Sequence, residues 1–187
     1  MEAFATADEL ATRLRREFSE EEKEWLDELL EDASAHLRDV IGDPVFPRVT
    51  TTYIAYPSGG REDIPGKPIV SVDAVTRDGV GIPFVYRPGY ILVDGDEPCE
   101  VTFTAGYAEP PRQLARIACV LVSQTLVTLE AQLGLTAGGL SSAAIDDFRL
   151  AWANAGEQSG MELQPRTEAM LRDTYGPGRI HVGGTRG

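Results

Sequence analysis

Acidic side chains recur along one early segment at a spacing that could hold a metal ion. Glu24, Glu28 and Glu31 follow one another at helical intervals, and Asp27 is an alternative to Glu28. Residues three and four apart share a helix face, so these carboxylates could bind Mg²⁺ for a nucleotide hydrolase. An amphipathic helix also needs a solvated face opposite its apolar one. We therefore expect an acidic solvent face and keep the hydrolase as the alternative.

A second candidate for chemistry, a phosphate-binding loop, fails on spacing. Gly60, Gly66 and Lys67 resemble its glycines and lysine, but five residues separate the glycines where four are required. Pro68 also replaces the hydroxyl residue that would bind Mg²⁺. A surface turn between strands is the expected structure.

The nucleophiles and histidines form no catalytic pattern. Ser141-Ser142 lacks the G-x-S-x-G context of a nucleophile elbow, and His36 and His181 are far apart in the sequence. Cys99 and Cys119 are too few for a disulfide framework or a zinc site. The sequence therefore predicts no catalytic residue, no metal ligand and no cofactor.

The net charge distinguishes this protein from proteins that bind DNA tightly. Among 187 residues, 30 are Asp or Glu and 17 are Lys or Arg, so the formal net charge is −13. Residues 1–47 carry 14 of the acidic and only 5 of the basic residues. DNA binding by counterion release needs the opposite sign, and an acidic surface repels DNA. The negative net charge therefore favours a protein through which DNA passes over a protein that binds DNA tightly.

Two helices are expected at the N-terminus. Thr6 with Glu9, and Ser19 with Glu22, match the capping box that begins a helix. The second helix is predicted over Glu20–Ile41 because leucines recur there at i, i+3, i+4 and i+7. Gly42-Asp43-Pro44 should end it.

From Arg48 to Gly106 the apolar period falls from about 3.6 to 2, which is typical of strands. Turn signals separate the predicted strands, which are Val49–Tyr56, Ile69–Arg77, Ile82–Tyr86, Tyr90–Val93 and Glu100–Thr104. This β-rich segment lies between helices, so we expect an insertion in a helical domain.

A long helix is expected from Pro110-Pro111 to about Leu133. Its centre is apolar on all faces, so it needs neighbours all round, from this chain or from another subunit. The uncharged stretch Ile117–Leu129 is too short to span a bilayer. Candidates for a contact between subunits are Val122, Leu126, Phe148 and Trp152.

The expected fold class is α+β and mainly helical: a helical bundle with a small antiparallel β insertion and an extended C-terminal tail. The N-terminal helices occupy 1–47, the β-rich insertion 48–106, and the flexible tail 176–187. The long helix, a linker and a closing helix from Pro165 to Tyr175 fill 107–175. Within the linker, Ala143–Trp152 fits a helix or a strand.

Three stretches, in order, make the chain similar to the head-to-tail connector (adaptor) proteins of long-tailed bacteriophages. Val101–Pro111, with Thr-Ala-Gly-Tyr at its centre, resembles the family's strand, "TAGY" segment and proline entry into a long apolar helix. Gly139–Leu150 resembles the segment "SEsIGDyxv", which favours an extended conformation there. Leu163–Tyr175 resembles the closing helix "LtPaxexxLrxyr".

The resemblance implies a virion structural protein that is not an enzyme. Such a protein forms a homo-oligomeric ring, in the family a dodecamer, beneath the portal and links it to the stopper (head-closure) or tail protein. Genomic DNA passes through the lumen during packaging and ejection without sequence-specific binding, and no membrane is involved. The protein would reside in the virion neck, and in the host cytoplasm during assembly. Candidates for the lumen lining are Glu20, Glu24, Glu28 and Glu31.

The glycine-rich end of the chain is basic on an acidic protein. We expect Arg179, Ile180, His181 and Val182 to add to an exposed strand edge of the portal. The alternative is a chain end without a role. Alternatives for the whole protein are another neck or tail ring protein, such as a stopper or terminator, and the Mg²⁺-dependent helical nucleotide hydrolase.

Overall fold

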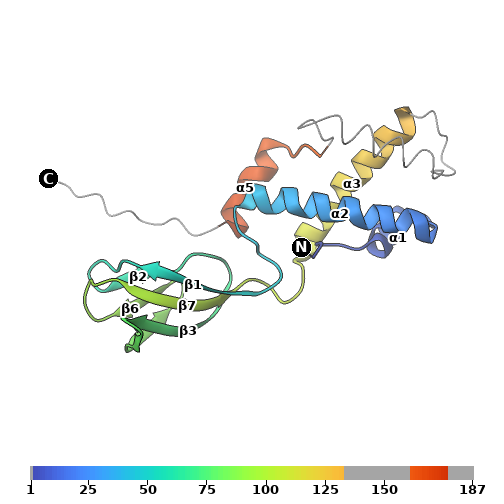
Figure 1. The fold of residues 1–187 in the computed structure, drawn as a ribbon. Coiled ribbons are helices and arrows are strands. Elements are labelled where there is room, and N and C mark those ends of the chain that lie inside the picture. The colour runs from blue at the N-terminus through green and yellow to red at the C-terminus, as the bar shows by residue number, and fades with distance from the viewer. Residues whose placement is uncertain (1, 133–160, 177–187) are drawn as a thin grey trace. The chain divides into compact units, whose positions relative to one another are not determined.

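The computed structural model describes residues 2–132 and 161–176, and the side chains of helix residues 128–132 are not among those described (Figure 1). These residues form four helices and seven strands. The chain divides into two compact units, each made from two stretches of sequence. The helical unit comprises Met1–Asp39 and Pro110–Glu168, and the β unit comprises Val40–Glu109 and Ala169–Gly187. Among the helices described, none has the length and apolar character needed to cross a membrane.

Helix α1 spans Ala7–Leu14 and begins with the expected capping box. The Glu9 amide donates to the Thr6 hydroxyl over 3.3 Å, and the Thr6 amide donates back to the Glu9 carboxylate over 3.2 Å. Arg15 ends the helix in the left-handed region at φ 52°. The two reciprocal bonds satisfy amides that a helix terminus otherwise leaves unpaired.

Helix α2 spans Glu20–Ile41, as the leucine spacing predicts. Its start repeats the capping pattern, with the Ser19 amide donating to Glu22 over 2.7 Å. The buried stripe consists of Trp25, Leu26, Leu29, Leu30, Ala33 and Leu37. Gly42 follows the helix at φ 76°, a conformation that glycine adopts without a steric penalty.

The two later helices also lie where the sequence predicts them. Helix α3 spans Arg112–Gln132, directly after Pro110-Pro111, and helix α5 spans Pro165–Tyr175. Along α3 the fully buried side chains are Leu114, Ala118, Cys119, Leu121 and Val122.

The β unit contains two antiparallel sheets. The first has the strand order β1-β7-β3-β4 and the second has the order β2-β6-β5. The strands are β1 Val49–Ala55, β2 Arg61–Asp63, β3 Ile69–Arg77, β4 Val80–Gly81, β5 Phe84–Arg87, β6 Tyr90–Val93 and β7 Cys99–Ala105. Strand β7 is central and pairs with β1 on one side and β3 on the other.

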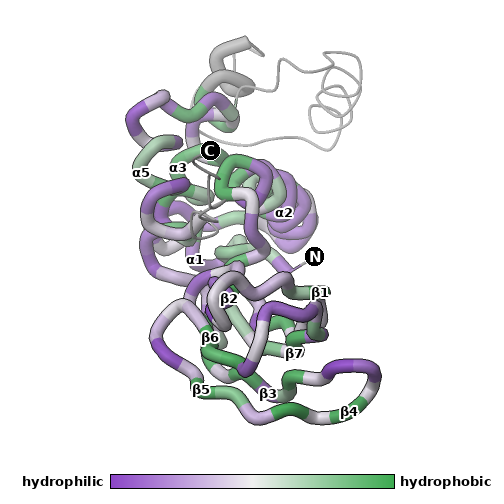
Figure 2. The backbone as a smooth tube through the Cα atoms, turned by 90° about the vertical axis from the view of Figure 1, so that its left-hand side faces the viewer, coloured by the Kyte–Doolittle hydropathy of each residue, from purple (hydrophilic) through white to green (hydrophobic). Residues whose placement is uncertain are grey.

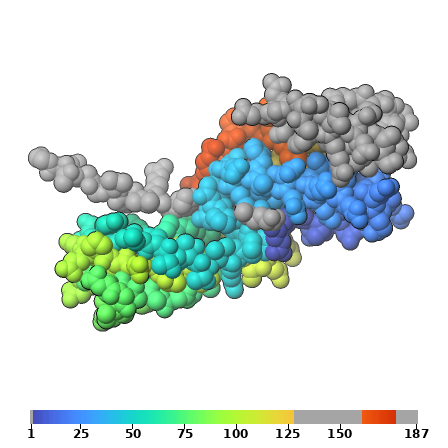
Figure 3. Space-filling view, viewed as in Figure 1, coloured from blue at the N-terminus to red at the C-terminus, as the bar shows by residue number. Residues whose placement is uncertain are grey.

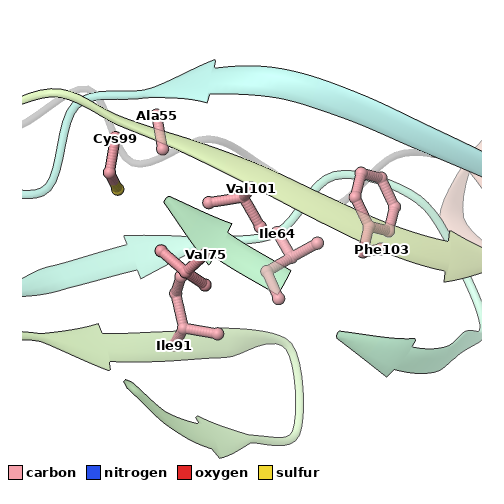
Figure 4. Packing of buried hydrophobic residues seen from close by; sticks show 7 residues of the cluster. All are labelled: Ala55, Ile64, Val75, Ile91, Cys99, Val101 and Phe103. Carbon is pink, nitrogen blue, oxygen red and sulfur yellow. The ribbon is translucent and has the colours of Figure 1, made fainter. Parts of the chain in front are cut away.

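A hydrophobic core lies between these sheets (Figure 4). Strands β1, β3 and β7 of the first sheet contribute to it, and Ile91 of β6 contributes from the second sheet. The full cluster is Ala55, Ile64, Val75, Ile91, Cys99, Val101 and Phe103. Residues from both sheets thus bury one another, which is how two antiparallel sheets form a stable layer pair.

The expected fold class is therefore wrong. The chain is a mixed α+β protein with two antiparallel sheets around a core of their own, and not a mainly helical bundle with a small β insertion. Strand β2 was not predicted because Arg-Glu-Asp has no apolar alternation. The predicted strand Ile82–Tyr86 lies two residues early, since β5 begins at Phe84 and the separate short strand β4 ends at Gly81. Apart from Gly176, the expected tail lies outside the described residues.

Candidate interaction surfaces

The four candidate lumen residues all belong to the exposed side of α2. Glu20, Glu24, Glu28 and Glu31 are exposed, opposite the buried leucines, and Figure 2 shows the hydrophilic residues along this helix. Helix α2 also lies open on one face of the space-filling view (Figure 3). A continuous acidic face of this kind repels a polyanion.

Electrostatics vary along this acidic face. At its start, the Lys23 ammonium lies 3.1 Å from the Glu20 carboxylate and 3.0 Å from that of Asp8. Further along, burial raises the pKa of Asp32, and the neighbouring charges of Glu28 and Glu31 raise it further. The carboxylates of Glu28, Glu31 and Asp32 therefore repel one another in the middle of the helix.

The carboxylates of α2 do not assemble into a metal site. Within residues 2–132 and 161–176, no group of three or more His, Cys, Asp or Glu side chains is placed to hold a metal ion. Asp27 has a structural partner instead, because its carboxylate accepts the Ala7 amide at the start of α1 over 2.7 Å. This carboxylate at a helix N-terminus stabilises α1.

The glycines near Lys67 do not cradle a phosphate either. The Gly60 amide donates to the Asp96 carboxylate over 2.8 Å, and its carbonyl accepts the Val93 amide over 2.8 Å. Gly60 is thus part of a turn beside β6, but strand β2 (Arg61–Asp63) occupies part of the stretch where only a surface turn was expected.

The structure divides the apolar residues of α3 between core and surface. Val122 is 0% exposed and Leu126 is 3% exposed within the single chain. By contrast, Val120 and Val127 are 47% and 66% exposed, and seven residues place them on one face two turns apart. Val120 and Val127 are therefore accessible at the surface of the chain, whereas Val122 and Leu126 are buried inside it.

The Thr-Ala-Gly-Tyr segment connects β7 to the start of α3 through a tight passage. Gly106 has φ 100°, and a Cβ there would lie 2.9 Å from the Val45 carbonyl oxygen. The Gly106 amide donates to Pro68 over 2.9 Å, and the next amide, of Tyr107, donates to Val45 over 2.8 Å. Only glycine combines this conformation with this close approach.

The same segment contacts the closing helix. The rings of Tyr107 and Tyr175 meet edge to face, with centroids 6.3 Å apart. Burial raises the pKa of Tyr175, and the Tyr107 phenol adds to that increase. Arg172 of α5 donates to the Val40 carbonyl over 3.0 Å. Two stretches that resemble the adaptor family, 101–111 and 163–175, therefore meet in the folded β unit.

Sequence reasoning missed an apolar pocket of about 210 Å³ in the β unit. The only signal was the recurrence of proline and glycine in Gly42–Pro47 and Ile64–Pro68, and Gly42-Asp43-Pro44 was interpreted as a helix stop. Burial raises the pKa of Asp43, the one titratable group in the wall. The lining is Asp43, Pro44, Val45, Pro47, Val49, Thr51, Pro65, Gly66, Phe103, Ala105 and Gly106.

Several sequence-predicted residues lie outside the described residues. They are the interface candidates Phe148 and Trp152 and the candidate portal-binding residues Arg179, Ile180, His181 and Val182. The segment Ala143–Trp152, for which helix and strand were both open, lies there too.

No protein-family model matches the chain, and no curated protein matches it either.

Proposed function

We propose that this protein is a virion structural protein, the head-to-tail adaptor of a long-tailed bacteriophage. It forms a ring of twelve subunits under the portal, in keeping with the family it resembles, and connects the portal to the stopper or tail protein. Genomic DNA passes through the ring. The observation that carries the proposal is the contact between Tyr107 and Tyr175, which joins two family-like stretches that lie far apart in the sequence.

The acidic face of α2 supports a DNA passage. Glu24, Glu28 and Glu31 are exposed on one helix that lacks a metal-holding group among the described residues. With a formal charge of −13 on each subunit, a ring that turns this face inward repels the DNA phosphates. DNA then slides through without adhering to the wall.

The exposed valines of α3 support a contact between subunits. Val120 and Val127 present two apolar side chains on one helical face, and a ring neighbour would remove them from water. Successive subunits in a ring contact one another through two different surfaces, so α3 supplies one half of such a contact.

Electron microscopy of the purified protein, alone and mixed with the cognate portal ring, tests the proposal. We expect a collar of added density beneath the portal, with the subunits in a ring. An intact portal without added density contradicts the adaptor function and favours another neck or tail protein, such as a stopper or terminator.

The tail provides a second test of the same proposal. We expect a chain without residues 177–187 to lose portal attachment, because Arg179–Val182 supplies the strand that adds to the portal. Its circular dichroism spectrum should match that of the full chain. Attachment that survives the deletion refutes the role of the tail.

A further inference from the structure

The apolar pocket of the β unit is suited to a side chain rather than to a whole small-molecule ligand. Its volume of about 210 Å³ exceeds the roughly 150 Å³ cavity that binds benzene. It is smaller than the roughly 300–1,000 Å³ of pockets that hold drug-sized ligands. One or two aliphatic side chains therefore fill it.

The pocket has one charged group in a mainly apolar wall. Asp43 lies beside Gly66, where an added Cβ would be 3.4 Å from the Asp43 carboxylate, and its other oxygen accepts the Val45 amide over 3.2 Å. Phe103, Val49 and the prolines supply the apolar surface. An occupant with an aliphatic group next to a cation complements this wall.

The last described residue contacts a residue that is close in sequence to the pocket wall. Gly176 packs against the backbone of Ile41, whose carbonyl oxygen would lie 3.2 Å from a Cβ at Gly176. Ile41 is only two residues before Asp43. Tyr175 contacts Tyr107, the neighbour of the pocket residue Gly106. All of these residues belong to the β unit.

The next residues have the length and the chemistry that the pocket requires. The chain continues as Pro-Gly-Arg-Ile-His-Val, so its first aliphatic side chain after Gly176 is Ile180, directly preceded by Arg179. Four residues span up to about 14 Å when extended. Asp43 is two residues after Ile41, which Gly176 contacts, so the Cα atoms of Ile41 and Asp43 are at most about 8 Å apart. Ile180 can therefore reach the pocket.

We infer that the pocket holds the C-terminal segment of the same chain, with Ile180 in the apolar cavity and Arg179 against the Asp43 carboxylate. The contact belongs to the protein before it meets a partner, and it stands apart from the adaptor proposal.

Trypsin cleavage at the Arg179–Ile180 bond, followed by mass spectrometry on the full chain, measures docking of the tail. We expect the wild type to be cleaved at least about tenfold more slowly than a synthetic peptide of residues 176–187, because cleavage follows the undocked population. Val49→Asp places a second negative charge in the pocket wall and should restore the rate of the peptide. Val85→Asp is the matched control: Val85 is 50% exposed, Val49 is 43% exposed, and only Val49 lines the pocket.

Three results overturn the inference. The first is that the wild type is cleaved as fast as the peptide, and the second is that Val49→Asp leaves the protection intact. The third is that protection disappears on dilution, which assigns the pocket to the tail of a second copy. Methyl NMR of Ile180→Ser avoids any change to the pocket wall: the Val49 methyl signals should shift and those of Val85 should not. Unchanged Val49 signals contradict docking. Neither measurement involves a ring or a portal, so failure here leaves the adaptor proposal intact.

Discussion

Replacing Gly106 with alanine tests how the chain passes from the β unit to α3. At φ 100°, a residue with a side chain is strained by roughly 1–2 kcal/mol. The added Cβ would also lie 2.9 Å from the Val45 oxygen and 3.2 Å from the Pro47 oxygen. Both are backbone atoms of one short segment, so relief requires a backbone shift, and overpacking of this kind costs about 1–3 kcal/mol. We expect Gly106→Ala to lower the free energy of unfolding by about 2–5 kcal/mol.

Two other glycines of the β unit separate these contributions. Gly89 has φ 89° with open space around it, so Gly89→Ala should cost only the conformational strain, roughly 1–2 kcal/mol. Gly81 has open space and no positive φ, so Gly81→Ala should stabilise by about 0.4–1 kcal/mol by restricting the unfolded chain. Urea unfolding followed by far-UV circular dichroism measures all three. If Gly106→Ala costs no more than Gly89→Ala, the close backbone approach at Gly106 is refuted.

Three further predictions follow from the placement of single side chains. Val122→Asp should unfold the chain, because a charge replaces a fully buried side chain, whereas Val127→Asp should stay folded as a monomer that forms no ring. Thermal melts and size-exclusion chromatography distinguish the two variants. If Val127→Asp still forms rings, the exposed face of α3 is not the contact between subunits. The pKa of Asp43 is raised by burial, so its stabilising contribution is present at low pH and lost as pH rises through that pKa. In the chain without residues 177–187, the stability of Asp43→Asn relative to the unsubstituted chain should therefore increase as the pH rises above roughly 4 in urea titrations, and a decrease contradicts the burial of the carboxylate. Mg²⁺-dependent nucleotide hydrolysis should be undetectable, and turnover abolished by Glu28→Gln would instead establish the hydrolase.

Local signals in the sequence located most of the elements. Capping boxes at Thr6 and Ser19 and the leucine spacing of α2 act within a few residues, so their effect is visible without the fold. The strand β3 and the helix α3 were predicted for the same reason. The acidic side of α2 was also expected, because an amphipathic helix exposes whatever lies opposite its apolar stripe.

The fold class and the exposed residues of α3 depended on contacts that no local pattern contains. Sheet pairing joins residues such as Thr50 and Thr104, whose hydroxyls lie 2.8 Å apart across 54 positions. This pairing gives the strands a hydrophobic core of their own, whereas the sequence pattern predicted only a small β insertion in a helical domain. In α3, valines occur on opposite faces, so composition alone could not tell buried Val122 from exposed Val127.

Helix starts, the change of apolar period and the concentration of negative charge can all be read from the sequence alone, because these properties depend on neighbours a few residues away. Tertiary folding alone brings Asp43, two residues after α2, together with Gly66 of a loop and Phe103 of β7 around one pocket. It also places the ring of Tyr175 against that of Tyr107. Burial and shape arise from segments that are distant along the chain, so they exist only once those segments have packed.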